Sequence, residues 1–208
     1  MSVIKTTIVD KRHKPGEVVE VDLHLNLTAD DLFETELVWG PNRLSAIQRL
    51  YLGGYPSEQM PQHYHWNWII KGKNLKLLAY RCLGIRCEGE MQGMMMVNLG
   101  GHFARLDPDR GKPILYIEYL ESAPWNVIPF VSKPRFGGIG TRFFDAAVRT
   151  SEEEGFEGRV GLHSLPQTEE FYGAVCGMTP NDPDPNHQGL RYFELTQEQA
   201  RKFLRGDL

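Results

Sequence analysis

The chain has 208 residues, of which 41% are hydrophobic and 24% are charged, and its formal net charge at pH 7 is −4. This balance is ordinary for a globular protein and gives no support to a broad nucleic-acid footprint. No apolar run approaches the ~20 residues of a membrane helix, and the first residues lack the basic-then-apolar pattern of a secretion signal. The three cysteines are odd in number and lack zinc-ligand spacing. We therefore expect one cytoplasmic domain over residues 1–208 with reduced cysteines.

The first third of the chain predicts two strands followed by a helical region. The strands, Val3–Val9 and Val18–Leu25, lie on either side of a turn signal at Lys14-Pro15-Gly16. Acidic residues after Thr28 indicate a helix start. The helical segments expected from there on run to Leu37, from Leu44 to Leu52 and from His63 to Lys71, with a break at Gly53-Gly54.

The remaining two thirds predict strands that alternate with helices. Leu77–Arg86 and Met91–Leu99 are typical of a hairpin, and the run Met94–Val97 is apolar on both faces, as in a covered central strand. An ordered excursion is expected at 122–134, a capping box at 164–167, and a Pro/Asp-rich loop at 181–188. Further strands are expected at Ile114–Glu121, Arg159–His163 and Leu190–Leu195, with helices after Thr141 and Gln167 and at Gln197–Leu204.

A glycine-rich stretch, Arg135-Phe136-Gly137-Gly138-Ile139-Gly140-Thr141, stands directly before the apolar-periodic segment Phe143–Val148. Glycines let a ligand approach the main chain, and the first N–H groups of a helix favour an anion. No lysine follows Gly140, as a mononucleotide loop requires, and Phe143 takes the place of the third glycine in the dinucleotide fingerprint. The stretch predicts either a phosphate-binding turn of another kind or a simple turn.

Arg135, Gly138 and Gly140 match the pattern Arg/Gln-x-x-Gly-x-Gly/Ala, and the flanking strand, helix, strand and Phe171-Tyr172 helix follow in the matching order. From about Glu90 to Phe193 the chain resembles the GNAT superfamily of acyl-CoA-dependent N-acyltransferases. The resemblance implies an α/β fold with a mixed, mostly antiparallel central sheet, flanking helices and a splayed central strand pair. It also implies a core with the acyl-CoA site at residues 76–208, and elaborated N-terminal strands and acceptor-side helices at residues 1–75.

The resemblance further implies transfer of acetyl from acetyl-CoA to a primary amine, directly and in a ternary complex. Coenzyme A is the expected co-substrate, with no metal, and the acceptor is expected to be a small-molecule or peptide amine rather than nucleic acid or membrane. The residues implied in cofactor binding are Arg135, Phe136, Gly137, Gly138, Ile139, Gly140, Thr141 and Ser164.

The same resemblance implies a carboxylate base on the strand before the glycine loop and a tyrosine acid on the helix that follows the next strand. Glu118 and Glu121 are the candidate bases, and strand alternation places them on opposite faces. Glu118 is preferred, and each carboxylate could instead be solvated or paired with arginine. Tyr172 is the candidate acid, because a phenol with a pKa near ~10 stays protonated at neutral pH; the alternative is a packed helix tyrosine.

The sequence leaves open two other functions, the roles of three histidines and the oligomeric state. A GNAT-like toxin acting on aminoacyl-tRNA and a non-catalytic acyl-CoA-binding module are the competing functions. His63 and His65 lack a partner at metal-ligand spacing, and His163 stands near a strand end, where it could assist catalysis or serve as a structural histidine. The oligomeric state is undetermined, with a homodimer as one option.

Overall fold

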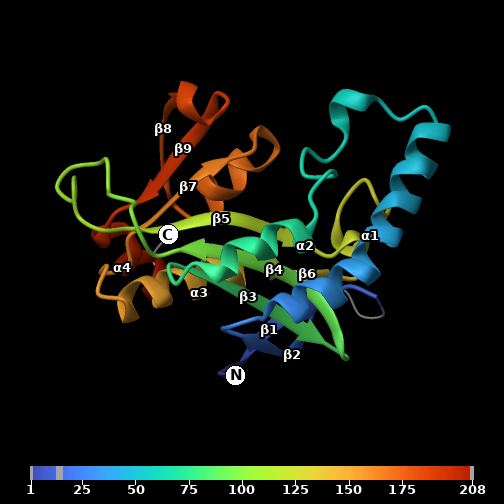
Figure 1. Cartoon of the computed structure of the whole chain (residues 1–208), viewed down its shortest axis with the longest axis horizontal. Helices are drawn as coiled ribbons and strands as arrows, with labels where there is room; N and C mark the ends of the chain where they lie inside the picture. The colour runs from blue at the N-terminus through green and yellow to red at the C-terminus, as the bar shows by residue number, and fades with distance from the viewer. Residues whose placement is uncertain (1, 13–15, 207–208) are drawn as a thin grey trace. The chain divides into compact units, whose positions relative to one another are not determined.

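The computed structural model describes residues 2–12 and 16–206, so Lys14 and Pro15 of the predicted turn lie outside the described residues. The chain divides into two compact units, residues 1–95 with 120–142 and residues 96–119 with 143–208. Figure 1 labels the elements of both. None of the helices in the described ranges is both long and apolar enough to cross a membrane.

The strands form a nine-stranded mixed sheet in the order β6-β1-β2-β3-β4-β5-β7-β9-β8, which confirms the predicted fold class. β5 and β7 pair in parallel, whereas β1–β2, β2–β3, β7–β9 and β8–β9 pair antiparallel. The strands are β1 (Val3–Asp10), β2 (Glu17–His24), β3 (Tyr80–Cys87), β4 (Glu90–Asn98), β5 (Leu115–Ser122), β6 (Phe136–Gly137), β7 (Val160–Ser164), β8 (Thr179–Asp184) and β9 (Leu190–Leu195).

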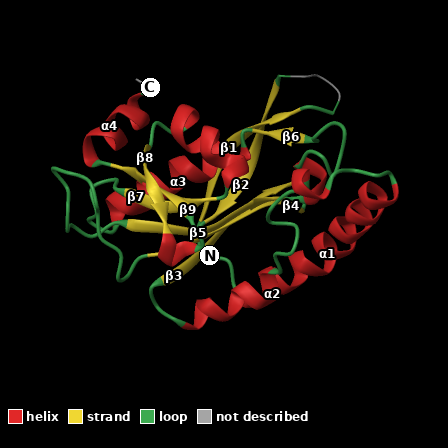
Figure 2. Ribbon diagram, turned by 90° about the horizontal axis from the view of Figure 1, so that it is seen from above, coloured by secondary structure: helices red, strands yellow, loops and turns green. Residues whose placement is uncertain are grey.

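The helices are α1 (Ala29–Leu52), α2 (Trp68–Lys71), α3 (Ile139–Glu153) and α4 (Gln197–Arg205), with short 3₁₀ or π turns between elements. α1 begins after Thr28, as the sequence indicated, and Thr28 and Asp31 bond reciprocally there in a capping box. The expected break after Leu37 is wrong, because α1 is one 24-residue helix that contains Pro41. Figure 2 shows this long helix without interruption. In the segment predicted from His63 to Lys71, residues 63–67 are turn or irregular, and only Trp68–Lys71, which form α2, are α-helical.

The first unit is built on β1 to β3, most of β4, α1 and α2. Trp39 of α1 and Trp68 of α2 are fully buried, and the Trp39 indole N–H donates to the Met91 carbonyl of β4 at 3.2 Å. Met94, Met95 and Met96 of β4 are likewise fully buried. The methionine run is therefore core, as the covered-strand interpretation predicted.

The second unit contains β7, β8, β9, α4 and most of α3. Residues 179–184 form strand β8 beside β9 rather than the loop that the Pro/Asp content indicated. Within this unit β5 and β7 pair from Leu115↔Val160 to Ile117↔Leu162, and the pairing of these two described strands stops there although both run on. The central parallel pair of strands thus parts at its carboxyl end.

Candidate active site

The glycine loop is a tight turn that opens α3. Gly138 has φ +81°, a conformation that favours glycine, and a side chain at this position would meet no atom within 4 Å. The first hydrogen bond of the helix runs from the Arg142 N–H to the Gly138 carbonyl at 3.1 Å. The amides of Ile139, Gly140 and Thr141 consequently have no acceptor inside the helix, and the positive end of its dipole points the same way. This arrangement suits a phosphate.

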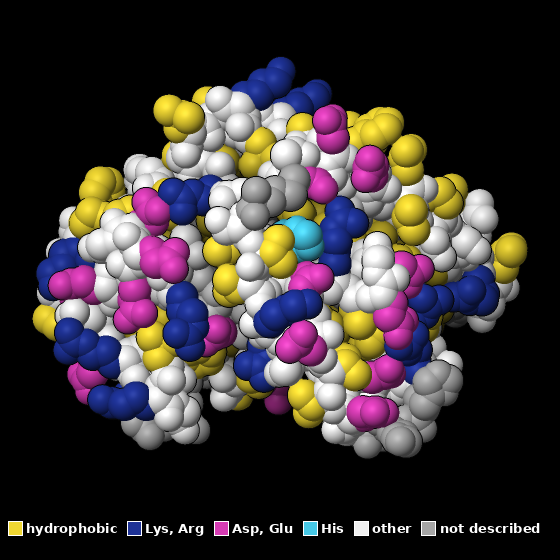
Figure 3. All heavy atoms as spheres, turned by 90° about the horizontal axis from the view of Figure 1, so that it is seen from below, with side chains coloured by type: hydrophobic (Ala, Val, Ile, Leu, Met, Phe, Trp, Pro, Cys, Tyr) yellow, Lys and Arg dark blue, Asp and Glu magenta, His cyan; other side chains and the backbone are white. Residues whose placement is uncertain are grey.

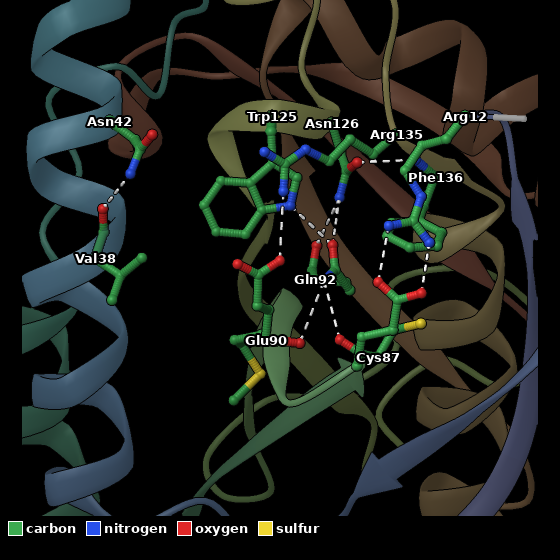
Figure 4. A network of polar contacts seen from close by, with 12 residues as sticks. Arg12, Val38, Asn42, Cys87, Glu90, Gln92, Trp125, Asn126, Arg135 and Phe136 are labelled. Atoms are coloured by element: carbon green, nitrogen blue, oxygen red, sulfur yellow. Dashed lines mark hydrogen bonds and ion pairs between the residues drawn. The ribbon is translucent and has the colours of Figure 1, made fainter.

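A polar network of Gln92, Trp125 and Asn126 supports the first residues of the loop (Figure 4). The Gln92 side-chain oxygen of β4 accepts from the Trp125 indole at 2.9 Å and from the Asn126 amide at 3.1 Å. Asn126 in turn accepts from the Phe136 N–H at 2.9 Å. The Phe136 amide already donates to a protein acceptor. The amides that remain open to a phosphate are therefore those that follow Gly137. No local pattern in the sequence indicates that Gln92 and Asn126 support the loop.

Arg135, the first residue of the motif, is exposed. Its guanidinium lies 5.1 Å from the Trp125 ring centroid and 3.4 Å from a Glu90 oxygen. A half-exposed ion pair of this kind is worth little, so the side chain can exchange Glu90 for another anion at small cost.

Glu121 belongs to a buried charge cluster of Glu36, Arg43, Trp68 and Glu121 in the first unit. One Glu121 oxygen accepts from Arg43 at 3.0 Å and the other from the Trp68 indole at 2.6 Å. Arg43 also bonds to Glu36, whose second oxygen accepts from the Trp68 backbone N–H at 2.9 Å. Burial raises the pKa of Glu121 to about 7, although Arg43 and Trp68 act in the opposite direction.

His63 lies beside this cluster, with its Nε2 4.0 Å from a Glu121 oxygen. Burial, and after it the charge of Arg43, lowers the pKa of His63 to about 4, so the ring is neutral at neutral pH. The cluster therefore holds one permanent cation against two carboxyl groups. Both oxygens of Glu121 are bonded within it and its side chain is 1% exposed, so an amine cannot reach this carboxylate without movement.

Glu118, in the second unit, has a more open setting. One of its oxygens accepts from the Asn98 side chain at 3.2 Å and lies 4.0 Å from His102 Nε2, and about a fifth of its side chain is exposed. Glu118 follows directly on the last β5–β7 pair, Ile117↔Leu162. Of the two predicted carboxylates, it is the one that combines exposure with a place where the strands part.

Tyr172 lies in the second unit within a five-residue π turn, Phe171–Val175. Such turns are rare and are frequent at functional sites. The side chain is buried against Phe171 and Phe193, and no hydrogen-bond partner for its hydroxyl is found in residues 2–12 and 16–206. Burial raises the pKa of Tyr172 above its usual value, so the hydroxyl remains protonated at neutral pH and has a proton to donate.

Ser164 ends β7, and its hydroxyl donates to the Leu165 carbonyl at 2.9 Å and lies 3.0 Å from the Thr168 hydroxyl. The predicted capping box is wrong, because Leu165 occupies the N-cap position without a side-chain bond and the first turn is 3₁₀. Pro166 in that first turn suits a helix start without a cap. The Ser164 hydroxyl thus stabilises the turn that leads towards Tyr172.

A histidine cluster, His163, Asp184 and His187, also lies in the second unit. His163 bonds the Tyr116 hydroxyl through Nδ1 at 2.6 Å and Asp184 through Nε2 at 3.1 Å, and His187 Nδ1 lies 3.3 Å from the same Asp184 oxygen. These three side chains could supply ligand atoms to a metal ion. The two imidazoles, however, stack at 3.7 Å and 9°, and an ion in the plane of both rings would require one ring to turn. Arg105, at 3.0 Å, already pairs with Asp184.

The predicted residues thus fall into two sets. The first unit holds Glu121 and the loop Arg135–Thr141, and the second holds Glu118, Ser164 and Tyr172. Sequence reasoning missed Arg43, although its place on the α1 face of Leu32, Trp39 and Ala46 is a signal, since a charge on a buried face needs a partner.

Comparisons with known proteins identify the fold that carries this site. No family model and no curated protein matches the chain. Among solved structures, the chain is similar to the GNAT domain of S. lividans PAT, with a TM-score of 0.53, 12% identity, and coverage of 92% of this chain and 96% of that one. A GNAT-family acetyltransferase from Listeria monocytogenes has a TM-score of 0.53 at 11% identity, covering 91% and 99%. Mycobacterium smegmatis RimJ, solved in complex with CoA-disulfide, has a TM-score of 0.51 at 13% identity, covering 99% and 94%. Their agreement over nearly the whole chain shows that this protein has the GNAT-domain fold.

Proposed function

We propose that the protein is an acyl-CoA-dependent N-acyltransferase that transfers acetyl from acetyl-CoA to a primary amine. The observation that carries the proposal is the Gly138 turn, after which the first amides of α3 have no acceptor inside the helix, in a chain with the GNAT fold. Coenzyme A carries a pyrophosphate, and unbonded amides at a helix start are suited to receive it.

The proposed chemistry is direct transfer. The amine loses a proton to Glu118 and its nitrogen attacks the thioester carbonyl carbon. The carbon–sulfur bond then breaks, and the departing thiolate takes the proton of Tyr172. The exposure of Glu118 and the protonated state of Tyr172 support these two roles. Glu121 is assigned to the buried charge cluster instead.

The acceptor is proposed to be a small-molecule or peptide amine. The net charge is −4, and on the face drawn in Figure 3 basic and acidic side chains are interspersed rather than gathered in one basic patch. A broad electrostatic footprint for RNA would need such a patch. A panel of amines assayed with acetyl-CoA, with thiol release as the signal, identifies the acceptor class; activity restricted to aminoacyl-tRNA would overturn this assignment.

Gly138→Asp is expected to weaken acetyl-CoA binding by about 10²–10⁴, the value of two charge-assisted hydrogen bonds. The change strains a φ of +81° and places a carboxylate where a pyrophosphate is expected. Gly155→Asp is the matched control, because Gly155 also has positive φ and open space around its Cβ but follows the end of α3. Calorimetry on the three proteins tests the assignment, and equal affinities for all of them would remove the phosphate loop.

Glu118→Gln is expected to lower the rate at neutral pH by about 10²–10⁴, with partial recovery at higher pH as the free amine deprotonates unaided. Glu121→Gln is the comparison, and we expect it to alter stability more than the pH–rate profile. If Glu118→Gln leaves that profile unchanged whereas Glu121→Gln shifts it, the base is Glu121.

A further inference from the structure

The N-terminal strand is joined to the glycine loop, although more than a hundred residues separate them. Val9 pairs with Gly137 and Asp10 with Phe136, and the Lys11 N–H donates to the Arg135 carbonyl at 2.8 Å. From the other side, Arg142 of α3 donates through Nε to the Thr7 carbonyl at 2.8 Å. The backbone of Lys11 is therefore fixed directly opposite the first residues of the loop.

The side chain of Lys11 runs along this backbone. A Cβ placed on Gly137 would lie 2.5 Å from Lys11 Cε and 2.8 Å from its Nζ, so the end of the lysine side chain passes directly over this glycine. The ammonium group therefore lies next to the residue that precedes Gly138.

The charge on Lys11 is not neutralised locally, in contrast to its neighbours. Arg12 bonds Asp10 and Glu88 at 2.7–2.9 Å, and Arg135 pairs with Glu90. No carboxylate partner for Lys11 is found in the part of the chain that the structure describes. Because the start of a helix carries partial positive charge, a cation beside it is stabilised when an anion is bound there.

We infer that Lys11 is a phosphate-binding residue, contributed by the N-terminal hairpin to the ligand site at the start of α3. The inference rests on the proposed function and extends it, because it adds a residue outside the loop motif. Coenzyme A offers two chemically similar partners, the pyrophosphate and the 3′-phosphate of its ribose. A lysine ammonium binds either as a point charge.

Calorimetry with wild type and Lys11→Gln, using CoA, 3′-dephospho-CoA and pantetheine as probes, tests this inference. We expect Lys11→Gln to weaken CoA binding by about ten- to hundredfold, the usual effect of one charge-assisted hydrogen bond. If Lys11→Gln loses affinity for both CoA and 3′-dephospho-CoA, Lys11 binds the pyrophosphate. If it loses affinity for CoA alone, Lys11 binds the 3′-phosphate. Pantetheine, which has no phosphate, should bind both proteins equally.

Two variants serve as controls. Lys11→Arg keeps the charge and should keep most of the affinity. Lys5→Gln removes a lysine of β1, the strand that Lys11 directly follows. The Lys5 ammonium is paired with Asp22 at 2.6 Å, and CoA affinity should not change. If wild type binds CoA and Lys11→Gln binds it equally, the inference is wrong while the proposed function stands. If wild type does not bind CoA at all, the proposed function itself fails.

Discussion

Tyr172→Phe is expected to lower kcat by about 10²–10⁴, the usual contribution of a general acid. The substitution removes one oxygen from a buried ring that packs against Phe171 and Phe193, so the fold should survive. Because the proton is needed only as the thiolate forms, the loss should appear in kcat while the affinity for acetyl-CoA stays nearly unchanged. Thiol release measured with saturating acetyl-CoA gives kcat, and calorimetry gives the affinity.

Tyr51→Phe provides the control, since Tyr51 is 82% exposed on α1 and its loss should change neither quantity. A Tyr172→Phe protein that retains wild-type kcat, measured under conditions where chemistry limits the rate, would mean that Tyr172 is a packing residue. Equal losses of kcat and acetyl-CoA affinity would instead indicate damage to the π turn.

Arg43→Met is expected to lower the free energy of unfolding by about 3–5 kcal/mol, because breaking a buried ion pair leaves an uncompensated charge. The methionine approximates the aliphatic part of arginine, but Glu121 and Glu36 lose their shared cation. Urea unfolding at constant pH measures the change. Arg149→Met, which breaks an exposed pair with Asp145 on α3, should lower it by no more than about 1 kcal/mol.

The loss of unfolding free energy caused by Arg43→Met should grow as the pH rises. The pKa of Glu121 in the folded protein is about 7, above the ~4.3 of an exposed glutamate. The stabilisation that this carboxyl group contributes is therefore fully present below pH ~4.3 and is lost as the pH rises through 7. Without Arg43 the charged form loses its main counter-charge, so the pKa rises further and the variant loses more between pH 5 and pH 8 than wild type does. Adding Glu121→Gln to Arg43→Met should recover part of the lost unfolding free energy. A loss that does not change with pH would contradict the assignment of this pH dependence to Glu121.

Features set by neighbouring residues could be predicted from the sequence. The strands other than β6 and β8, the Gly138 turn and the start of α1 after Thr28 depend on local alternation, backbone freedom and capping, and they lie close to where the patterns place them. The prediction divided α1 after Leu37, whereas the helix continues through Pro41, a residue that removes a helical hydrogen bond. Trp39 and Arg43 on either side are both buried, and this packing keeps the helix continuous where local propensity alone would end it.

Long-range pairing could not be predicted. Alternation put Glu118 and Glu121 on opposite faces but could not say which of them meets an arginine, because Arg43 is far away in the chain. Residues 181–188 looked like a loop from their prolines and aspartates. Thr179–Asp184 nevertheless forms an edge strand, a position where proline is tolerated, with a register shift between Pro180 and Pro183. The role of Lys11 also depends on a strand pairing with no local signature.

The pairing of Asp10 with Phe136 has a consequence for how the chain folds. The entropy needed to close a chain segment rises with its length, so contacts of this separation form late and slow folding. During synthesis the β1–β2 hairpin emerges long before its partner in the loop. Until Phe136 arrives, the outer edge of β1 near Val9 has no strand to pair with and can accept one from another chain. The segment that completes the turn at Gly138 is thus also the one that closes this edge.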